Sequence, residues 1–151
     1  MITYLEGDAT NPVGEGLKLI CHISNDLGAW GAGFVMALSR NWDEPETFYR
    51  SQKNLVLGDV QYVDVEDDIV VCNMIGQHGI GRDINGQPPI RYDATRECLR
   101  NVNRYAVRWG ATIHAPRFGS GLSGGNWGII EKIINDEVIV DVYIYDLPKK
   151  F

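Results

Sequence analysis

Apolar runs along the chain predict a series of strands. The runs 17–23 and 69–72 are mostly apolar, which is typical of strands buried on both faces. The run 60–65 is rich in Val and Tyr with polar residues between them, which favours a half-exposed strand. In chain order, the predicted strands are a short one that begins at Ile2 and ends in the turn at Gly7, then 17–23, 60–65, 69–72, 111–115 and 138–145.

Apolar residues spaced three and four apart predict helices between these strands. A first helix follows Gly33 and ends within 41–45, and a second short helix is predicted at 46–52. A long helix follows Pro89 and is capped by Gly110. The apolar stripes of the three clearest helices are Phe34, Val35, Leu38 and Trp42; Ala94, Cys98, Val102, Tyr105, Ala106 and Trp109; and Trp127, Ile130, Ile133 and Ile134.

Helices interspersed with strands predict a mostly parallel or mixed sheet with helices on both faces. The expected fold is therefore a three-layer α/β/α sandwich around a central mixed sheet of about six strands. The chain of 151 residues has the length of one domain, which we place at 1–151. Ligands of such sheets sit beyond the carboxyl ends of the strands, so the loops that follow strands are the candidate sites.

Two of these loops are rich in glycine. The first, 22–33, reads HISNDLGAWGAG and runs from a predicted strand into a predicted helix. Glycines let backbone amides approach an anion closely, and the unpaired amides and dipole of a helix N-terminus favour negative charge. The second, 116–125, reads PRFGSGLSGG and also follows a strand. We expect both loops to face one crevice, which predicts a site for a nucleotide diphosphate or a sugar phosphate.

The composition narrows the choice of partners. The net charge of −6 disfavours nucleic acid as the main partner, since backbone binding needs a basic surface, but it permits a small anionic ligand. No apolar run approaches the ~20 residues that cross a bilayer, so no membrane partner is expected. The three Cys residues lie in apolar runs and no signal segment is visible, which favours the cytoplasm. No Cys/His spacing indicates zinc, and we expect neither a metal nor a cofactor.

Four segments in order resemble the macrodomain family, which has an ADP-ribose-binding fold. They are Gly7-Asp8-Ala9-Thr10, the loop from His22 to Gly33, the loop Gly119-Ser120-Gly121-Leu122-Ser123-Gly124, and the last strand Tyr143-Ile144-Tyr145-Asp146-Leu147. The resemblance covers nearly the whole chain. It implies that the early acid, Asp8, receives the adenine amino group, that Asn25 fixes the distal ribose, and that both glycine-rich loops hold the diphosphate.

Within that family, the sequence is similar to the ADP-ribose 1''-phosphate phosphatase-like branch, also called Appr-1-p processing proteins. The residues that carry this likeness are His22, Asn25, Gly28, Trp30, Gly31 and Gly33, followed by Ser120-Gly121-Leu122 and Trp127. Two other branches remove ADP-ribose by deacylation and fit less well. One has an Asp just after the first loop, where this chain has Val35. The other uses a Lys with an Asp in the second loop, but this chain has Ser123 there and no Lys within 72–78.

The resemblance also predicts which residues contact the ligand. These residues are Asp8, Ala9, Asn25, Trp30, Gly31, Ala32, Gly33, Phe34, Arg117, Gly119, Ser120, Gly121, Leu122, Ser123, Gly124 and Tyr145. Some of them have a structural alternative. Asp8 can close a turn, Asn25 can cap its own loop, and Trp30 can anchor that loop to the core. Arg117 can form a surface ion pair, and Tyr145 can be an ordinary core residue.

The candidate catalytic residues are His22 and Asn25. An imidazole beside the distal ribose, with a pKa near ~6.5, can protonate a leaving alkoxide or activate water. At the end of a buried strand, His22 can equally be a satisfied core residue. His78, in the loop 76–89, either lines the crevice or is exposed to solvent, and His114 is expected to be structural.

Three functions follow from this pattern. The first is hydrolysis of ADP-ribose 1''-phosphate to ADP-ribose and phosphate without a metal. The second is a binding module that recognises free or attached ADP-ribose without chemistry. The third is a hydrolase that removes ADP-ribose from a protein or a nucleic acid, so that ADP-ribosylated macromolecules become partners beside the small molecule.

Overall fold

The computed structural model describes residues 1–148, so the last three residues of the expected domain 1–151 lie outside the described residues. The described chain folds into β1 (Ile2–Glu6), β2 (Lys18–Asn25), α1 (Phe34–Asn41), α2 (Glu44–Ser51), β3 (Val60–Glu66), β4 (Ile69–Gln77), α3 (Tyr92–Trp109), β5 (Thr112–Ala115), α4 (Trp127–Glu137) and β6 (Val142–Asp146).

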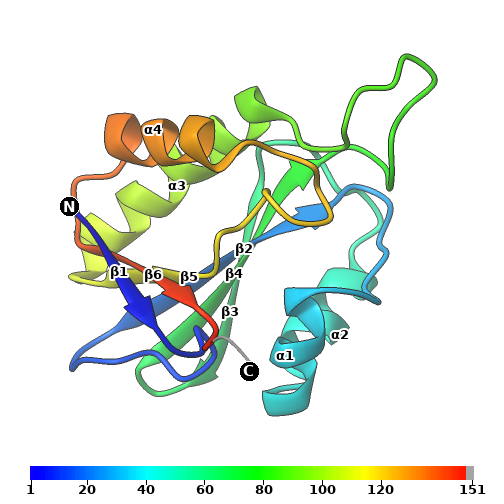
Figure 1. Ribbon diagram of the computed structural model, residues 1–151. Coiled ribbons are helices and arrows are strands. Elements are labelled where there is room, and N and C mark those ends of the chain that lie inside the picture. Colours follow the sequence, from blue (N-terminus) through cyan, green and yellow to red (C-terminus); the bar gives the residue numbers. More distant parts are fainter. Residues whose placement is uncertain (149–151) are drawn as a thin grey trace.

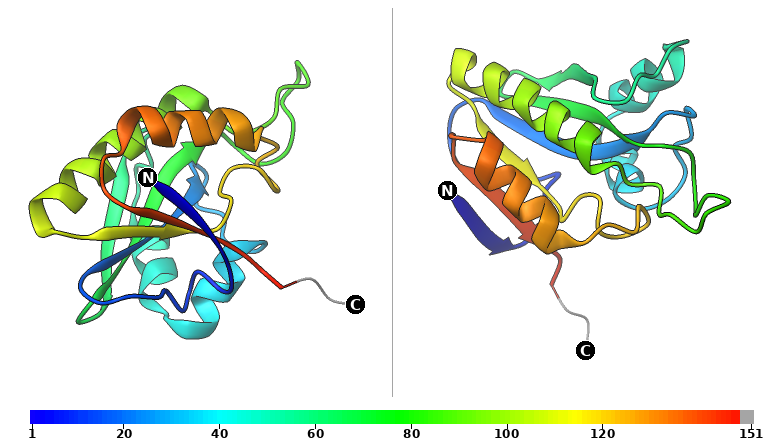
Figure 2. Two further views of the ribbon diagram at one scale, coloured as in Figure 1. Left: turned by 60° about the vertical axis from the view of Figure 1, so that its left-hand side comes forward. Right: turned by 90° about the horizontal axis from the view of Figure 1, so that it is seen from above.

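All six strands form one sheet in the order β1-β6-β5-β2-β4-β3 (Figure 1). Neighbouring strands are parallel except for β3, which runs antiparallel to β4 at one edge. The helices form two further layers. Figure 2 shows α3 and α4 side by side over one face, while α1 and α2 cover the other face near β2, β4 and β3. The predicted three-layer α/β/α sandwich with a mixed sheet of six strands is confirmed.

Alternate residues of the strands build two apolar cores. The core under α3 and α4 includes Leu19, Cys21 and Ile113 from the strands, packed against Leu99 and Ile134 of the helices. A smaller core under α1 and α2 is made of Ile20, Trp30, Leu38, Tyr49, Ile69, Val71 and Ile75. The alternation along a pleated strand assigns each residue to one core or the other.

Some element boundaries differ from the sequence prediction. β4 continues past the predicted end at Cys72 to Gln77, because Asn73 is buried and its polar atoms are satisfied by neighbouring groups. The first helix ends at Asn41, within the predicted 41–45, but α2 begins at Glu44 rather than at 46 and holds Pro45 in its first turn, where a missing N–H costs nothing. The last strand begins at Val142 rather than at 138.

Because β1, β6, β5, β2 and β4 are parallel, their carboxyl ends lie at one edge of the sheet. The loops that follow β2, β4 and β5 gather at that edge in Figure 1. Within residues 1–148, no helix is long and apolar enough to span a membrane.

Candidate functional site

The first glycine-rich loop, 26–33, is braced by the side chain of Asn25 at the end of β2. The Asn25 Oδ1 accepts hydrogen bonds from the amides of Leu27 (3.0 Å) and Ala29 (3.1 Å). Its Nδ2 donates to the Ala29 carbonyl at 2.8 Å. Asn25 therefore caps its own loop, which was the structural alternative that the sequence left open. One Nδ2 hydrogen has no acceptor within residues 1–148, so a ligand contact at Asn25 stays a prediction.

Helix α2 holds the carbonyl groups of the same loop. Arg50 donates to the carbonyls of Gly28 (3.3 Å) and Trp30 (3.0 Å), and the Tyr49 hydroxyl lies 2.5 Å from the Asn25 carbonyl. In the described chain, the amides of residues 31–34 have no acceptor, and no side chain caps α1. With its carbonyls tied to α2, the loop presents a run of free N–H groups at a helix N-terminus.

The second glycine-rich loop, 116–125, closes on itself by backbone bonds. Gly125 donates to the Gly119 carbonyl at 2.7 Å, and Gly124 donates to the Gly121 carbonyl at 3.0 Å. These bonds leave the amides of residues 119–123 without an acceptor in the part of the chain that the structure describes. The loop therefore supplies a second run of free N–H groups, which is the arrangement that binds an anion.

The two loops lie next to each other at Gly33 and Leu122. A Cβ atom added at Gly33 would lie 3.3 Å from a methyl group of Leu122. Gly33 also has a φ of +80°, which other residues rarely adopt. In the second loop, the buried Ser123 hydroxyl donates to Oε1 of Gln77, the last residue of β4, at 2.5 Å. Ser123, which stands where the resemblance puts the Asp of the Lys–Asp branch, is thus part of a neutral pair.

At the other end of the sheet edge lie Asp8 and Tyr145. One oxygen of Asp8 accepts bonds from the Thr10 amide (2.8 Å) and hydroxyl (2.7 Å), which closes a turn, while the other oxygen has no partner within residues 1–148. The Tyr145 side chain is buried, and its hydroxyl bonds to the Val13 amide and to His114. Asp8 can still accept a bond from a ligand, whereas the Tyr145 hydroxyl is already engaged.

Comparison with known proteins places this geometry in a family. A macrodomain protein from Streptomyces coelicolor is 42% identical, and the match covers 97% of this chain and 99% of that chain with a TM-score of 0.83. This chain belongs to the macrodomain family. A protein of unknown function from Bacteroides thetaiotaomicron is similar as well, with 51% identity, 97% and 98% coverage and a TM-score of 0.95. No family model matches the chain.

Two more distant relatives extend the comparison. The macrodomain is 30% identical to the mouse chromodomain-helicase-DNA-binding protein 1-like over 164 residues, which is 98% of this chain but 18% of that protein. The chain therefore spans less than a fifth of that curated relative. A variant macrodomain of Oceanobacillus iheyensis with ADP-ribose has the same fold, with 17% identity, 99% and 86% coverage and a TM-score of 0.68.

In this macrodomain, His22 lies in the core under the first loop. Its side chain is 2% exposed, and its ring packs against Trp30 and Phe34 with centroids 5.5 and 5.9 Å apart. Nε2 lies 2.6 Å from Asn73 Oδ1. Burial lowers the pKa of His22 to about 4, although the hydrogen bond with Asn73 acts in the opposite direction. The ring is therefore neutral at pH 7 and supports the loop, and its catalytic role stays a prediction.

Two further predicted contacts have structural roles. The Arg117 guanidinium makes two bonds to Asp146, at 2.7 and 2.9 Å, and lies over the rings of Tyr4 and Trp127. This is the surface ion pair that the sequence left open as the alternative. Trp30 is 5% exposed, and its Nε1 donates to Ser39 at 2.8 Å, so it anchors the loop. Ligand contacts of both residues stay predictions.

Sequence reasoning missed Arg50 and Tyr49, which hold the first loop, and it did not predict that Asp26 pairs with His78. His78 Nδ1 lies 2.7 Å from Asp26 Oδ2, so the two residues form a pair between the loops after β2 and β4. A carboxylate immediately after one strand and a histidine immediately after its neighbour were the available signals. Within residues 1–148, no group of three or more His, Cys, Asp or Glu residues is placed to hold a metal ion.

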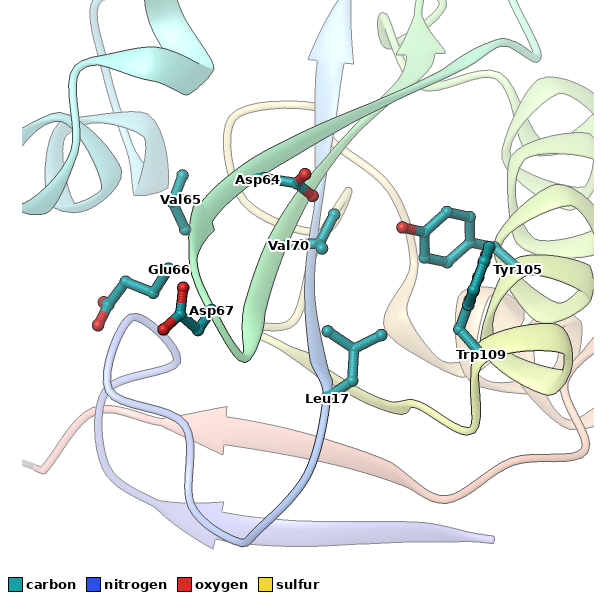
Figure 3. Close-up of a pocket in the computed structure, with 8 residues that line it drawn as sticks. All are labelled: Leu17, Asp64, Val65, Glu66, Asp67, Val70, Tyr105 and Trp109. Atoms are coloured by element: carbon teal, nitrogen blue, oxygen red, sulfur yellow. The ribbon is translucent and has the colours of Figure 1, made fainter.

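Two cavities lie away from the glycine-rich loops. One of about 560 Å³ lies between the β3–β4 turn and the end of α3. Figure 3 shows Leu17 and Val70 between the acidic residues of that turn and the rings of Tyr105 and Trp109. The other, of about 390 Å³, lies beside β3. Neither is lined by a residue of the predicted crevice.

Proposed function

We propose that this macrodomain binds ADP-ribose across the carboxyl edge of its sheet and hydrolyses ADP-ribose 1''-phosphate to ADP-ribose and phosphate. The observation that carries the binding proposal is the pair of free amide runs, 31–34 and 119–123, on two loops that touch. Two runs of N–H groups match the two phosphates of a diphosphate. The complex of a related macrodomain with ADP-ribose adds support.

The same geometry supports one orientation of the ligand along the carboxyl ends of the strands. Asp8 follows β1 and has one free carboxylate oxygen for the adenine amino group. Asn25 follows β2 and has one free amide hydrogen for the hydroxyl groups of the distal ribose. The diphosphate then lies over the loops after β2 and β5. This orientation places the 1''-phosphate near the ends of β2 and β4.

The phosphatase activity is supported by the motif of His22, Asn25 and the glycines that follow, and by the neutral Ser123–Gln77 pair. That pair lacks the charges that a Lys–Asp deacylation mechanism uses.

The test is a phosphorus NMR time course of ADP-ribose 1''-phosphate with the protein in catalytic amount. Growth of the inorganic phosphate signal is the expected result. In a second sample, with the protein equimolar to the ligand, shifted and broadened diphosphate signals without release of phosphate would instead support the binding module. If that sample shows neither release of phosphate nor a change in the diphosphate signals, both functions are contradicted. A parallel assay on ADP-ribosylated protein separates the third function, removal of ADP-ribose from macromolecules.

A further inference from the structure

A histidine–carboxylate pair lies directly after β2 and β4, where the proposed function puts the distal ribose. Asp26 is the first residue after β2, and His78 is the first residue after β4, the parallel neighbour of β2. His78 Nδ1 lies 2.7 Å from Asp26 Oδ2. The second oxygen of Asp26 accepts the Gly79 N–H at 2.8 Å. The carboxylate therefore bonds to both the ring and the backbone of one short segment.

The backbone around His78 is fixed although it belongs to a loop. The His78 amide donates to the Pro89 carbonyl at 2.9 Å, and the Arg91 amide donates to the Gly76 carbonyl at 2.8 Å. The Gln77 side chain donates to the Gly79 carbonyl at 2.9 Å. These bonds hold the imidazole in one place, as a catalytic group requires.

The pair also fixes the tautomer of the ring. A carboxylate accepts hydrogen bonds, so Nδ1 carries the hydrogen that bonds Asp26, and the Nε2 lone pair of the neutral ring points away from the pair. The His78 side chain is 59% exposed, in contrast to the buried rings of His22 and His114. His78 is therefore the histidine of the chain that a ligand and a water molecule can reach.

Few charges surround this ring. In the part of the chain that the structure describes, Asp26 is the charged side chain that contacts it. Within its own loop, Arg82 donates to the Gly86 carbonyl and Asp83 pairs with Arg91 at 3.7 Å. The second glycine-rich loop adds no ionisable side chain between Phe118 and Asn126. Burial acts to raise the pKa of Asp26, but the bonds from Gly79 and His78 outweigh it, so that pKa lies below its usual value.

The order of the strands sets where a bound ADP-ribose would meet this pair. Asp8 follows β1, whereas Asp26 and His78 follow β2 and β4, three and four strands away. At ~4.8 Å per strand, the two ends are about 14–19 Å apart, a span that an extended ADP-ribose covers. With adenine at Asp8, the distal ribose lies beside the pair.

We propose that His78 is the general acid–base residue of the phosphatase reaction and that Asp26 is its positioning residue. This inference rests on the proposed function. The Nε2 atom takes one proton from water as the water oxygen bonds to phosphorus. The bond between phosphorus and the ribose 1'' oxygen breaks, its electron pair stays on that oxygen, and the imidazolium returns the proton there. One water and one phosphomonoester give one ADP-ribose and one phosphate.

The test uses His78→Gln, Asp26→Asn and, as the matched control in the same loop, Ile84→Ala, whose side chain is fully exposed. Phosphate release from ADP-ribose 1''-phosphate is followed by phosphorus NMR from pH 5.5 to 8.5, and ADP-ribose affinity is measured by calorimetry. We expect His78→Gln to lower kcat about 100-fold or more and to flatten its pH dependence, since positioned acid–base groups contribute ~10²–10⁴-fold. Asp26→Asn should lower kcat roughly tenfold or more, and Ile84→Ala should match the wild type.

Each outcome decides between the proposals. A loss of kcat in His78→Gln with ADP-ribose affinity within about threefold of wild type supports the acid–base role. A kcat within about threefold of wild type overturns the role of His78 and leaves the phosphatase proposal standing. Equal losses of affinity and turnover overturn the acid–base role in favour of loop support. If the wild type binds ADP-ribose but releases no phosphate, the phosphatase proposal fails, and the role of His78 fails with it.

Discussion

At the scale of single residues, the contrast among the histidines follows from what each ring touches. The amide of Asn73 donates to the Pro45 carbonyl (3.2 Å) and to Gln61 (3.0 Å), so its oxygen must face His22. His22 Nε2 therefore carries the hydrogen, and the ring is held neutral in an apolar core. The sequence left a core position open for His22 and an exposed position open for His78, but it could not decide either. The fold decides both, because it buries His22 and exposes His78.

The burial of His22 predicts a loss of stability in mild acid. Its pKa is about 4 in the folded protein against 6.5 for an ordinary histidine. The unfolded state therefore binds more protons between those values, and the free energy of unfolding falls as the pH drops below 6.5. From pH 7 to pH 5, His22 contributes a loss on the order of 2 kcal/mol.

Urea unfolding of the wild type and of His22→Gln at pH 7 and pH 5 measures this loss. The variant should lose less stability than the wild type over that interval, and the remaining dependence includes His114, whose burial also lowers its pKa to about 4. Identical losses in the two proteins would contradict the assignment of His22 as a buried neutral ring.

At the scale of elements, most strands and helices could be predicted because their apolar patterns reflect burial directly. The apolar patterns gave wrong boundaries where tertiary contacts set the end of an element. β4 extends through Asn73 and Gly76 because the groups around them satisfy the buried polar atoms or need the space of an absent side chain. Likewise, the glycines predicted both loops. The hydrogen bonds from Tyr49 and Arg50 of α2 to the first loop could not be predicted, because they depend on which residues face the loop after folding.

The hydrogen bonds from Arg50 of α2 to the first loop lead to a prediction about ligand affinity. Arg50→Ala removes the bonds to the carbonyls of Gly28 and Trp30, so the Trp30–Gly31 peptide group can turn and the Gly31 amide can leave the free run 31–34. We expect ADP-ribose affinity to fall about fivefold, the equivalent of about 1 kcal/mol, because the loop must then be ordered on binding. Calorimetry measures the affinity, with the exposed Arg40→Ala of α1 as the matched control. Equal affinities of both variants would show that the loop is ordered without Arg50.

At the scale of the whole molecule, the sheet fixes the distance between the two ends of the proposed site. Asp8 and Asn25 lie at the carboxyl ends of β1 and β2, three strands apart. They share no hydrogen-bonding partner within residues 1–148. Substitutions this far apart act independently when the scaffold between them is rigid. If the sheet is rigid, a substitution at one end should therefore not change the effect of a substitution at the other end. ADP-ribose affinity measures this independence.

We predict that the losses of ADP-ribose affinity in Asp8→Ala and Asn25→Ala add in the double variant. Each single change should lower affinity roughly tenfold, one by removing an adenine contact and the other by loosening the first loop, and the double change roughly 100-fold. Calorimetry on the four proteins gives the coupling energy, which should lie within ~0.5 kcal/mol of zero. Asp67→Ala, at the opposite edge of the sheet, is the control. A coupling above that range would mean that both residues act on one part of the ligand, and the extended orientation would be wrong.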